Sequence, residues 1–506
     1  MRAARSVEDQ AVEDQAVTDQ AQGGVYVPLS YEVDLDGRAE PKFLRHFNEL
    51  VSGALAHGWP VVAQARLFDH LTTAPPVSWA AQDPLPRTAE QLDGLDRRVI
   101  SDQVEAQILE QTGGTAEAWV ALGKVVFPQL EAAVHDCLQA IVAQYGGIKA
   151  VLMWRSLPSV RQAADRLGVP VVDLELGSIR RPLYRDTMAY FQFGPKFDPA
   201  EYERRLARFQ AETATAPCPL LTRKEILALF LRDRDLRRLS TMDDYEPFEV
   251  GLALAPAGDV EARSTDSPLR PELLRRVQAL APAETVLVRP YYPERPQFDR
   301  LQVDHSIDAA EFVLSCRRVV SSVSNLAYET MLYGKTAYIW GPMPFASAGV
   351  MTAERLDESV VDLERLNWIS FGFFAPYDLI GDQDYLDWRL SQPSETAIYR
   401  RHLEYYLDRW SVPSAALELT GQDRMAAFLA PRGFGSAAAV IGPSRRQAVQ
   451  ELARLRTDKA TLEQRAAQAD ERQAQAEEQL EAVWRSNSWR VTKPLRVVSD
   501  RLRRSR

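Results

Sequence analysis

The chain has 506 residues and a net charge of -10, from 60 Lys and Arg against 70 Asp and Glu. Hydrophobic residues make up 46% and charged residues 26%, which excludes global disorder and collagen-like architectures. The acidic average argues against a nucleic-acid-binding protein. Three scattered cysteines (Cys137, Cys218 and Cys316) form no zinc or disulfide pattern. No stretch approaches the roughly 18 apolar residues that a membrane span needs.

Residues 1–24 are predicted to be disordered. They contain the imperfect acidic repeat VEDQAVEDQAVTDQ and no apolar segment of the kind that a signal peptide requires. A segment of this composition buries too little apolar surface to offset the entropy lost on ordering.

Short apolar runs alternate with amphipathic helical patterns through the body of the chain. The runs read as buried strands: GWPVVAQA, KAVLMW, VPVVDLELG, ETVLVRPY, RRVVSS and TAYIWG. The helical segments between them include PKFLRHFNELVSGALAHG and PSVRQAADRLG. This alternation predicts an α/β protein with two Rossmann-like domains, residues 25–241 and 242–430, and ligands at the carboxyl ends of the strands.

The composition changes after Gly435. Residues 435–484 are predicted to be a linker and a long helix, since residues 444–484 contain neither Pro nor Gly. Apolar residues recur there every seven positions at Leu455, Leu462, Ala469, Ala476 and Val483. This partial heptad pattern is consistent with a coiled-coil oligomer or with a solitary charged helix.

The segment SSVSNLAYETMLYGKTAYIWG, residues 321–341, carries the clearest chemical pattern. A strand ends in serines at a helix start, which directs O–H and N–H donors toward an anion. Glu329 lies one turn into that helix, where a carboxylate could accept hydrogen bonds from a ribose. Ordinary helix capping with a surface acid is the alternative. The predicted donor-site residues here are Ser321, Ser322, Ser324 and Glu329.

This segment resembles the nucleotide-binding half of GT-B glycosyltransferases. It is most similar to bacterial capsule and lipopolysaccharide enzymes that transfer Kdo, an acidic sugar, from CMP-Kdo. The segment VLVRPYYP precedes the serine segment in the chain, at the position where the family usually has His-Pro. This chain has Tyr291 and Tyr292 there instead. The resemblance implies that Arg289, Tyr291 and Tyr292 contact the donor phosphates. No metal is expected, because no DxD-like acidic cluster lies at a strand end, and no cofactor is expected beyond the nucleotide sugar.

Residues 151–194 are similar to the N-terminal domain of the retaining β-Kdo transferases of O-antigen assembly. The shared features are an Arg-x-Leu-Pro-Ser helix start and the run ELGSIRRPLY. They imply Glu175 as the catalytic acid/base, with Arg180 and Arg181 binding the donor's carboxylate or phosphate. A structural ion pair between Glu175 and Arg180 is the alternative.

The family's nucleophile segment is altered in this chain. The corresponding region reads VGLALAPAGDVEARST, and Asp259 is the nearest carboxylate. Either Asp259 is the catalytic nucleophile or the nucleophile is lost. A third similar segment, residues 376–407, carries no obvious catalytic group.

The last 22 residues, 485–506, form a basic tail. Eight Lys and Arg against one Asp give it a charge of +7, which leaves about -17 on residues 1–484. RSNSWRVTKPLR resembles the ending of bacterial polysaccharide glycosyltransferases. Interleaved aromatic, aliphatic and basic residues suit an anionic membrane surface. We therefore expect a cytoplasmic protein, peripheral on the inner face of the cell membrane; a flexible tail without a target is the alternative.

Three functions are compatible with these features. The first is a glycosyltransferase that moves a sugar from a nucleotide donor to a glycan or lipid-linked acceptor of a surface polysaccharide. The second is a catalytically degenerate scaffold of the same fold, which the altered nucleophile segment favours. The third, a sugar-nucleotide epimerase, gives no reason for the basic tail.

Overall fold

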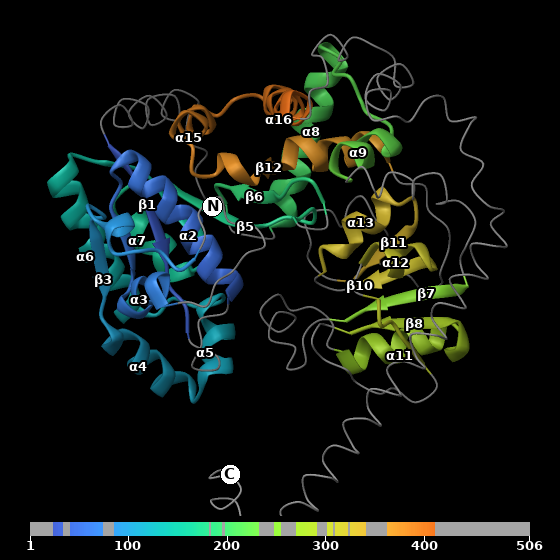
Figure 1. Cartoon of the computed structure of the whole chain (residues 1–506), viewed down its shortest axis with the longest axis horizontal. Helices are drawn as coiled ribbons and strands as arrows, with labels where there is room; N and C mark the ends of the chain where they lie inside the picture. The colour runs from blue at the N-terminus through green and yellow to red at the C-terminus, as the bar shows by residue number, and fades with distance from the viewer. Residues whose placement is uncertain are drawn as a thin grey trace, which may run out of the picture. The chain divides into compact units, whose positions relative to one another are not determined.

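The computed structural model describes residues 24–33, 41–73, 85–181, 184–194, 198–231, 247–254, 270–290, 301–306, 309–321, 324–340 and 362–409. Within these ranges the strands form two separate sheets (Figure 1). The predicted long helix, the basic tail and the N-terminal repeat lie outside the described residues.

The first sheet has seven strands in the described ranges, in the order β12-β6-β5-β4-β1-β2-β3. β1 to β5 run parallel, whereas β6 is antiparallel to both β5 and β12. The strands are β1 (Val25–Ser30), β2 (Val61–Gln64), β3 (Arg97–Ile100), β4 (Ile148–Trp154), β5 (Val171–Leu176), β6 (Met188–Gln192) and β12 (Phe374–Pro376).

Helices cover both faces of this sheet. One face packs against α2 (Pro41–His57), α3 (Ala65–Thr73) and α15 (Gln383–Leu390). The other packs against α4 (Asp102–Thr112), α5 (Thr115–Leu122), α6 (Pro128–Tyr145) and α7 (Pro158–Asp165). A short turn, η1 (Glu90–Leu92), precedes β3.

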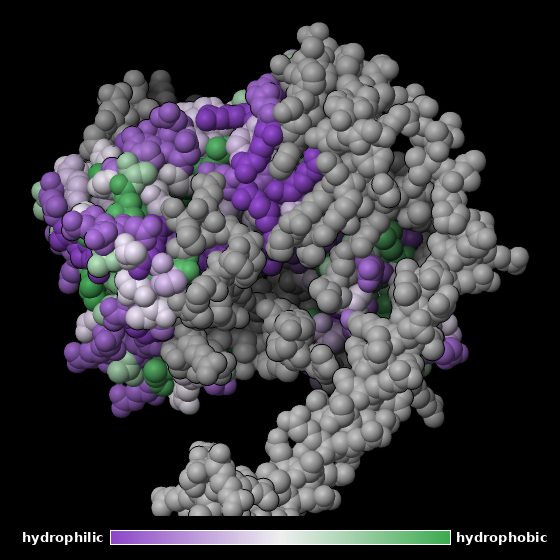
Figure 2. All heavy atoms as spheres, viewed as in Figure 1, coloured by the Kyte–Doolittle hydropathy of each residue, from purple (hydrophilic) through white to green (hydrophobic). Residues whose placement is uncertain are grey.

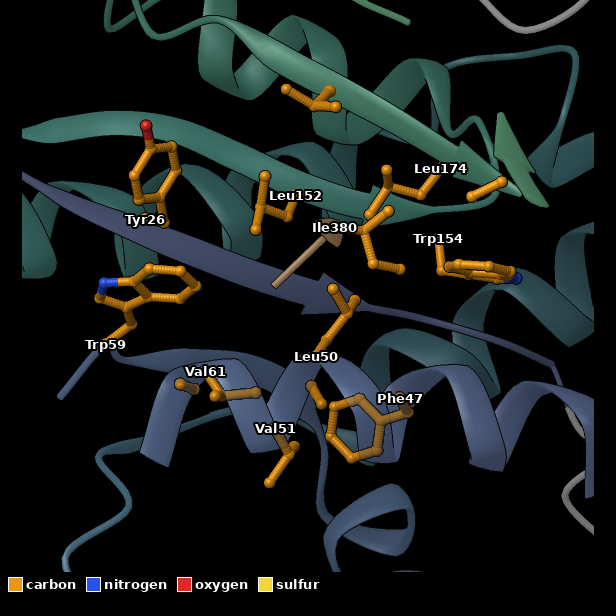
Figure 3. Close-up of a cluster of buried hydrophobic side chains, with 14 of the residues drawn as sticks. Tyr26, Phe47, Leu50, Val51, Trp59, Val61, Leu152, Trp154, Leu174 and Ile380 are labelled. Atoms are coloured by element: carbon orange, nitrogen blue, oxygen red, sulfur yellow. The ribbon is translucent and has the colours of Figure 1, made fainter. Parts of the chain in front are cut away.

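The continuous apolar run of β4 follows from this two-sided packing. Leu152 and Trp154 join the cluster on the α2 face, while Val151 and Met153 join the cluster on the α6 face. A strand covered on both faces has no solvent side, so it loses the polar alternation of a half-exposed strand. Figure 3 shows Leu152 and Trp154 in the first cluster, with Phe47, Leu50 and Val51 of α2.

The second sheet has five parallel strands in the described ranges, in the order β11-β10-β7-β8-β9. They are β7 (Phe248–Ala253), β8 (Val286–Arg289), β9 (Gln302–Val303), β10 (Cys316–Ser321) and β11 (Thr336–Ile339). Its helices are α11 (Arg270–Leu280), α12 (Ala309–Leu314) and α13 (Leu326–Leu332), with the turn η3 (Ala283–Thr285) before β8. α11 packs Leu273 and Val277 onto one face of the sheet.

A further group of elements is rich in aromatic residues. It consists of α8 (Pro199–Thr215), α9 (Arg223–Phe230), α14 (Leu363–Asn367), the π-helical turn η5 (Trp368–Phe373), η6 (Tyr377–Leu379) and α16 (Glu395–Arg409). Phe230, Phe371 and Tyr406 contact one another here through their rings. Tyr328 of α13 reaches the same group, because its hydroxyl lies 2.6 Å from Ser370 Oγ. We call these elements the aromatic layer.

The domain boundary differs from the predicted one. The sequence interpretation placed residues 242–430 together in the second domain, yet Phe374–Pro376 pairs with β6 of the first sheet. The chain therefore returns to the first sheet after its second domain. A three-residue strand carries too little periodicity to be recognised in sequence.

The surface in Figure 2 mixes hydrophilic and hydrophobic residues, with hydrophilic side chains gathered over α16. Arg400, Glu404, Asp408 and Arg409 of this helix are exposed. Among the described residues, none of the helices is long and apolar enough to cross a membrane.

Candidate functional site

Ser321 ends β10 at the carboxyl edge of the second sheet. Its side chain is only 1% exposed, and its hydroxyl has no hydrogen-bond partner within the described ranges. A buried polar group without a partner costs about 1–3 kcal/mol. Because ligands of such sheets bind at the carboxyl ends of strands, this hydroxyl is suited to a ligand contact.

The helix after β10 begins with two polar residues of different roles. Ser324 Oγ accepts a hydrogen bond from the Leu326 N–H at 3.2 Å, so it caps α13. The Asn325 side chain makes no capping bond. Instead, Asn325 Oδ1 accepts from the Tyr190 hydroxyl at 2.8 Å, and Nδ2 donates to the Leu176 carbonyl at 3.2 Å. These bonds join α13 to β5 and β6 of the first sheet.

Glu175 lies on β5, next to that junction. Its carboxylate accepts from the Leu176 N–H at 3.0 Å and is half-buried. Glu175 stands opposite Tyr190 in the β5–β6 register. Burial raises the pKa of Tyr190 well above its usual value, Tyr202 and the charge of Glu175 raise it further, and Arg180 lowers it. Acidic and basic groups therefore both lie near this hydroxyl.

The two neighbouring arginines differ in their partners. Arg180 Nε donates to the Gly177 carbonyl at 2.8 Å. Arg181 Nη2 instead pairs with Asp186 at 2.8 Å and with both carboxylate oxygens of Asp378, at 2.8 and 2.9 Å. Arg181 is therefore held by two carboxylates, which leaves Arg180 as the better of the two candidates for an anionic ligand.

Glu329 is buried in α13. The Tyr184 hydroxyl donates a hydrogen bond to Glu329 Oε2. Burial, followed by the charge of Glu329, raises the pKa of Tyr184 well above its usual value, so the hydroxyl keeps its proton. A ribose could reach this carboxylate only by sharing it with Tyr184 or replacing it.

Arg289 ends β8 at the carboxyl edge of the second sheet. Its guanidinium forms an ion pair with Asp304 and donates to the Ser306 carbonyl at 3.1 Å. A donor phosphate that binds Arg289 would therefore share its guanidinium with the carboxylate of Asp304.

Four predicted site residues lie outside the described residues: Ser322, Asp259, Tyr291 and Tyr292. Their roles stay predictions. In the ranges that the structure describes, the His, Cys, Asp and Glu side chains form no group of three that could hold a metal ion.

The first sheet also places buried polar atoms at its carboxyl edge. Tyr31 follows β1, Trp154 ends β4 and Ser178 follows β5. Their side chains are buried, and Tyr31 OH, Trp154 Nε1 and Ser178 Oγ have no partner among the residues described. Figure 3 shows the Trp154 ring at one end of the apolar cluster, close to where the strands end. These atoms are candidates for contacts with an acceptor.

Sequence reasoning did not single out Tyr190, Asn325, Trp154 or Ser178. An asparagine at a helix start reads as a cap, and aromatic residues in a strand read as core. The sequence did contain one signal for Asn325. Ser324 and Asn325 are both potential caps of the same helix, and one helix end needs only one capping side chain.

Residues 84–199 match the family described as the glycosyltransferase 99 family N-terminal domain. The matched range contains Trp154, Glu175, Arg180, Arg181 and Tyr190. None of the curated protein sequences matches this chain.

Several solved structures resemble this chain at low sequence identity. The β-Kdo 2,4 transferase KpsC of Thermosulfurimonas dismutans is 14% identical and covers 48% of this chain and 87% of its own, with a TM-score of 0.32. Os79 from O. sativa, solved with UDP and deoxynivalenol-3-glucoside, is 13% identical and covers 76% and 99%, with a TM-score of 0.30. The UDP-GlcNAc 2-epimerase of Methanocaldococcus jannaschii is 7% identical and covers 64% and 88%, with a TM-score of 0.26. Scores this low carry no argument about function.

The predicted α/β class with two Rossmann-like domains is confirmed by the two sheets and their helices. The predicted transferase class is confirmed by the family match. The match supports a glycosyltransferase and names neither its donor nor its acceptor.

Proposed function

We propose that the protein is a GT-B glycosyltransferase that moves an acidic sugar, such as Kdo, from a CMP-activated donor to a glycan or lipid-linked acceptor of a surface polysaccharide. The observation that carries this proposal is the junction of the two sheets at α13. Asn325, which follows the predicted donor-site serines, bonds to the strand end that holds Glu175. A nucleotide sugar at β10 would thus lie beside a carboxylate able to act as general acid/base.

An acidic sugar is favoured by the charges around this strand end. Arg180 is half-buried, and its guanidinium is held by a carbonyl through Nε at 2.8 Å. A guanidinium bound in this way keeps N–H groups that can reach the carboxylate of a sugar. On the acceptor side, Trp154 Nε1 and Ser178 Oγ are neutral donors that suit sugar hydroxyls.

The test is a thermal-shift screen of the full chain with CMP, UDP, GDP and dTDP, followed by turnover of the matching sugar nucleotides. We expect CMP to raise the melting temperature most, because a ligand that binds only the folded state stabilises it. Glu175→Gln should keep that shift and lose about 10²–10⁴-fold in turnover. Absence of a shift with every nucleotide would contradict the proposal.

A degenerate scaffold is the second candidate. It is favoured by the pairing of Arg181 with Asp186 and Asp378, and of Arg289 with Asp304, since both arginines were predicted to contact the donor. On this alternative, CMP would shift the melting temperature while no sugar nucleotide turned over. Asp259→Asn would then change nothing, whereas for a covalent mechanism it would abolish transfer.

We further propose that residues 485–506 hold the protein on the inner face of the cell membrane. Each Lys or Arg near an anionic bilayer contributes about 1 kcal/mol, and salt screens part of that contribution. Full-length protein should therefore sediment with anionic liposomes and be partly released by high salt. A protein truncated after Gln479 should remain in the supernatant; equal sedimentation of both would show that the tail is not the anchor.

A further inference from the structure

Asn325 connects the two sheets through both ends of its amide. Oδ1 accepts from the Tyr190 hydroxyl at 2.8 Å, and Nδ2 donates to the Leu176 carbonyl at 3.2 Å. Leu176 is the last residue of β5 and Tyr190 lies on β6, so one side chain spans two paired strands. An amide suits this place because one atom accepts and the other donates. Neither an aspartate nor an alanine could make both bonds.

This contact is not a by-product of helix capping. An asparagine before a helix usually accepts from a backbone N–H of the first turn. Here Ser324 Oγ accepts that hydrogen bond from Leu326, and the Asn325 side chain makes no capping bond. The capping serine therefore leaves the asparagine amide available for the first sheet.

The strand end that Asn325 holds is also the one that carries Glu175. Glu175 and Tyr190 are register partners in an antiparallel pair, so their side chains emerge on one face of the sheet with Cβ atoms about 4.5–5.5 Å apart. Tyr190 is buried, and its ring packs at a steep angle against Phe373 and Phe374. Rings locked in this way leave the hydroxyl little freedom, so its position is fixed by the core.

From this geometry we infer that Tyr190 and Asn325 form a positioning pair, which fixes the distance between the Glu175 carboxylate and the donor bound at β10 and α13. The inference rests on the proposed function of the site. Neither residue touches the reacting atoms. Their effect is to hold the catalytic strand end and the nucleotide-side helix in one geometry, where a displacement of about 1 Å can cost about 10²-fold in rate.

The first arm of the test needs no substrate. Hydrogen exchange of the full chain would be compared among wild type, Tyr190→Phe and Asn325→Ala, with Tyr202→Phe as the control. Tyr202 lies on α8, and its buried hydroxyl bonds to Gln192 of β6. In both test variants, amides of 174–177 and 326–332 should exchange about fivefold faster, which corresponds to the loss of one hydrogen bond. In the control, residues 326–332 should be unchanged.

The second arm measures turnover of the sugar nucleotide that the donor screen identifies. Tyr190→Phe should lower kcat about tenfold or more while the KM for the donor changes less than twofold. Asn325→Asp keeps an acceptor for the Tyr190 hydroxyl but places a carboxylate oxygen against the Leu176 carbonyl. Its kcat should therefore be no higher than that of Asn325→Ala. In a Glu175→Gln background, Tyr190→Phe should cause no further loss of kcat, because its effect acts through Glu175.

Several outcomes would overturn the inference. One is faster exchange in α13 alone, with the end of β5 unchanged. Another is an equal further loss of kcat when Tyr190→Phe is added to Glu175→Gln, which would mean that the hydroxyl acts independently of Glu175. If instead no nucleotide binds at all, the proposed function fails, while the exchange arm still decides whether Tyr190 and Asn325 couple the two elements.

Discussion

One buried ion pair in the aromatic layer and three side chains at the carboxyl edges of the two sheets differ in whether their buried polar atoms have hydrogen-bond partners. In the aromatic layer, the buried Arg205 donates to both oxygens of the buried Glu395, at 2.8 and 3.0 Å, and to the Gly372 carbonyl at 3.0 Å. At the sheet edges, Ser321, Trp154 and Ser178 bury polar atoms that have no partner in the part of the chain that is described.

Paired and unpaired buried polar groups have different effects on the stability of the unliganded protein. Paired polar groups in a core stabilise one arrangement, and removing one partner is costly because the other is left buried and unsatisfied. Unpaired buried groups destabilise the unliganded protein, and those at the three strand ends are candidates for ligand contacts. The two regions therefore respond differently to the same chemical substitution.

The largest expected effect is in the aromatic layer. Glu395→Gln leaves the buried Arg205 without its counter-charge and should lower the free energy of unfolding by about 3–5 kcal/mol. The control is Glu272→Gln on α11, since its ion-pair partner Arg276 is 47% exposed. An exposed pair contributes about 0–1 kcal/mol. Urea unfolding followed by tryptophan fluorescence measures both, and equal losses would contradict the distinction.

Much of the fold could be predicted from the sequence. The six predicted apolar runs are strands β2, β4, β5, β8, β10 and β11, and the helix predicted from Pro41 is α2. Strands that are buried on both faces read as continuous apolar runs. The pairing of β12 with β6 could not be predicted, because it joins residues almost 200 positions apart through only three residues.

The candidate site could be predicted only in part. The serines at the end of β10 were evident because a strand end followed by a helix start is a local pattern. The pairing of Arg181 with Asp378 was not, since those residues are far apart in sequence and meet only through the returning chain segment. The Tyr190–Asn325 contact was missed for the same reason.

The second prediction concerns pH and the aromatic layer. His402 is buried, with one ring nitrogen 2.9 Å from the Tyr385 hydroxyl and the other 2.8 Å from the Phe371 carbonyl. Burial, and then the charge of Arg389, lowers its pKa well below 6.5. The unfolded chain takes up a proton below pH 6.5 that the folded chain does not, so stability is full above that pH and falls on acidification.

The expected slope is up to about 1.4 kcal/mol per pH unit between pH 6.5 and 5.5. His402→Gln removes the titrating group, so its urea midpoint should change less over this range, although its stability at pH 7.5 should be lower. Parallel curves for wild type and variant would show that His402 is not the group responsible.

The smallest expected effect compares one substitution in the two regions. Ser321→Ala and Ser370→Ala each remove a buried hydroxyl. The Ser370 hydroxyl donates to the Leu366 carbonyl at 2.6 Å and lies 2.6 Å from the Tyr328 hydroxyl, so its loss should cost about 1–2 kcal/mol. Ser321→Ala should leave the free energy of unfolding unchanged or raise it by up to about 1 kcal/mol, because no hydrogen bond is lost. The same variant should lose most of the CMP-induced thermal shift, while Ser370→Ala should keep it. A destabilised Ser321→Ala protein that still responds fully to CMP would place Ser321 with the structural groups and remove it from the donor site.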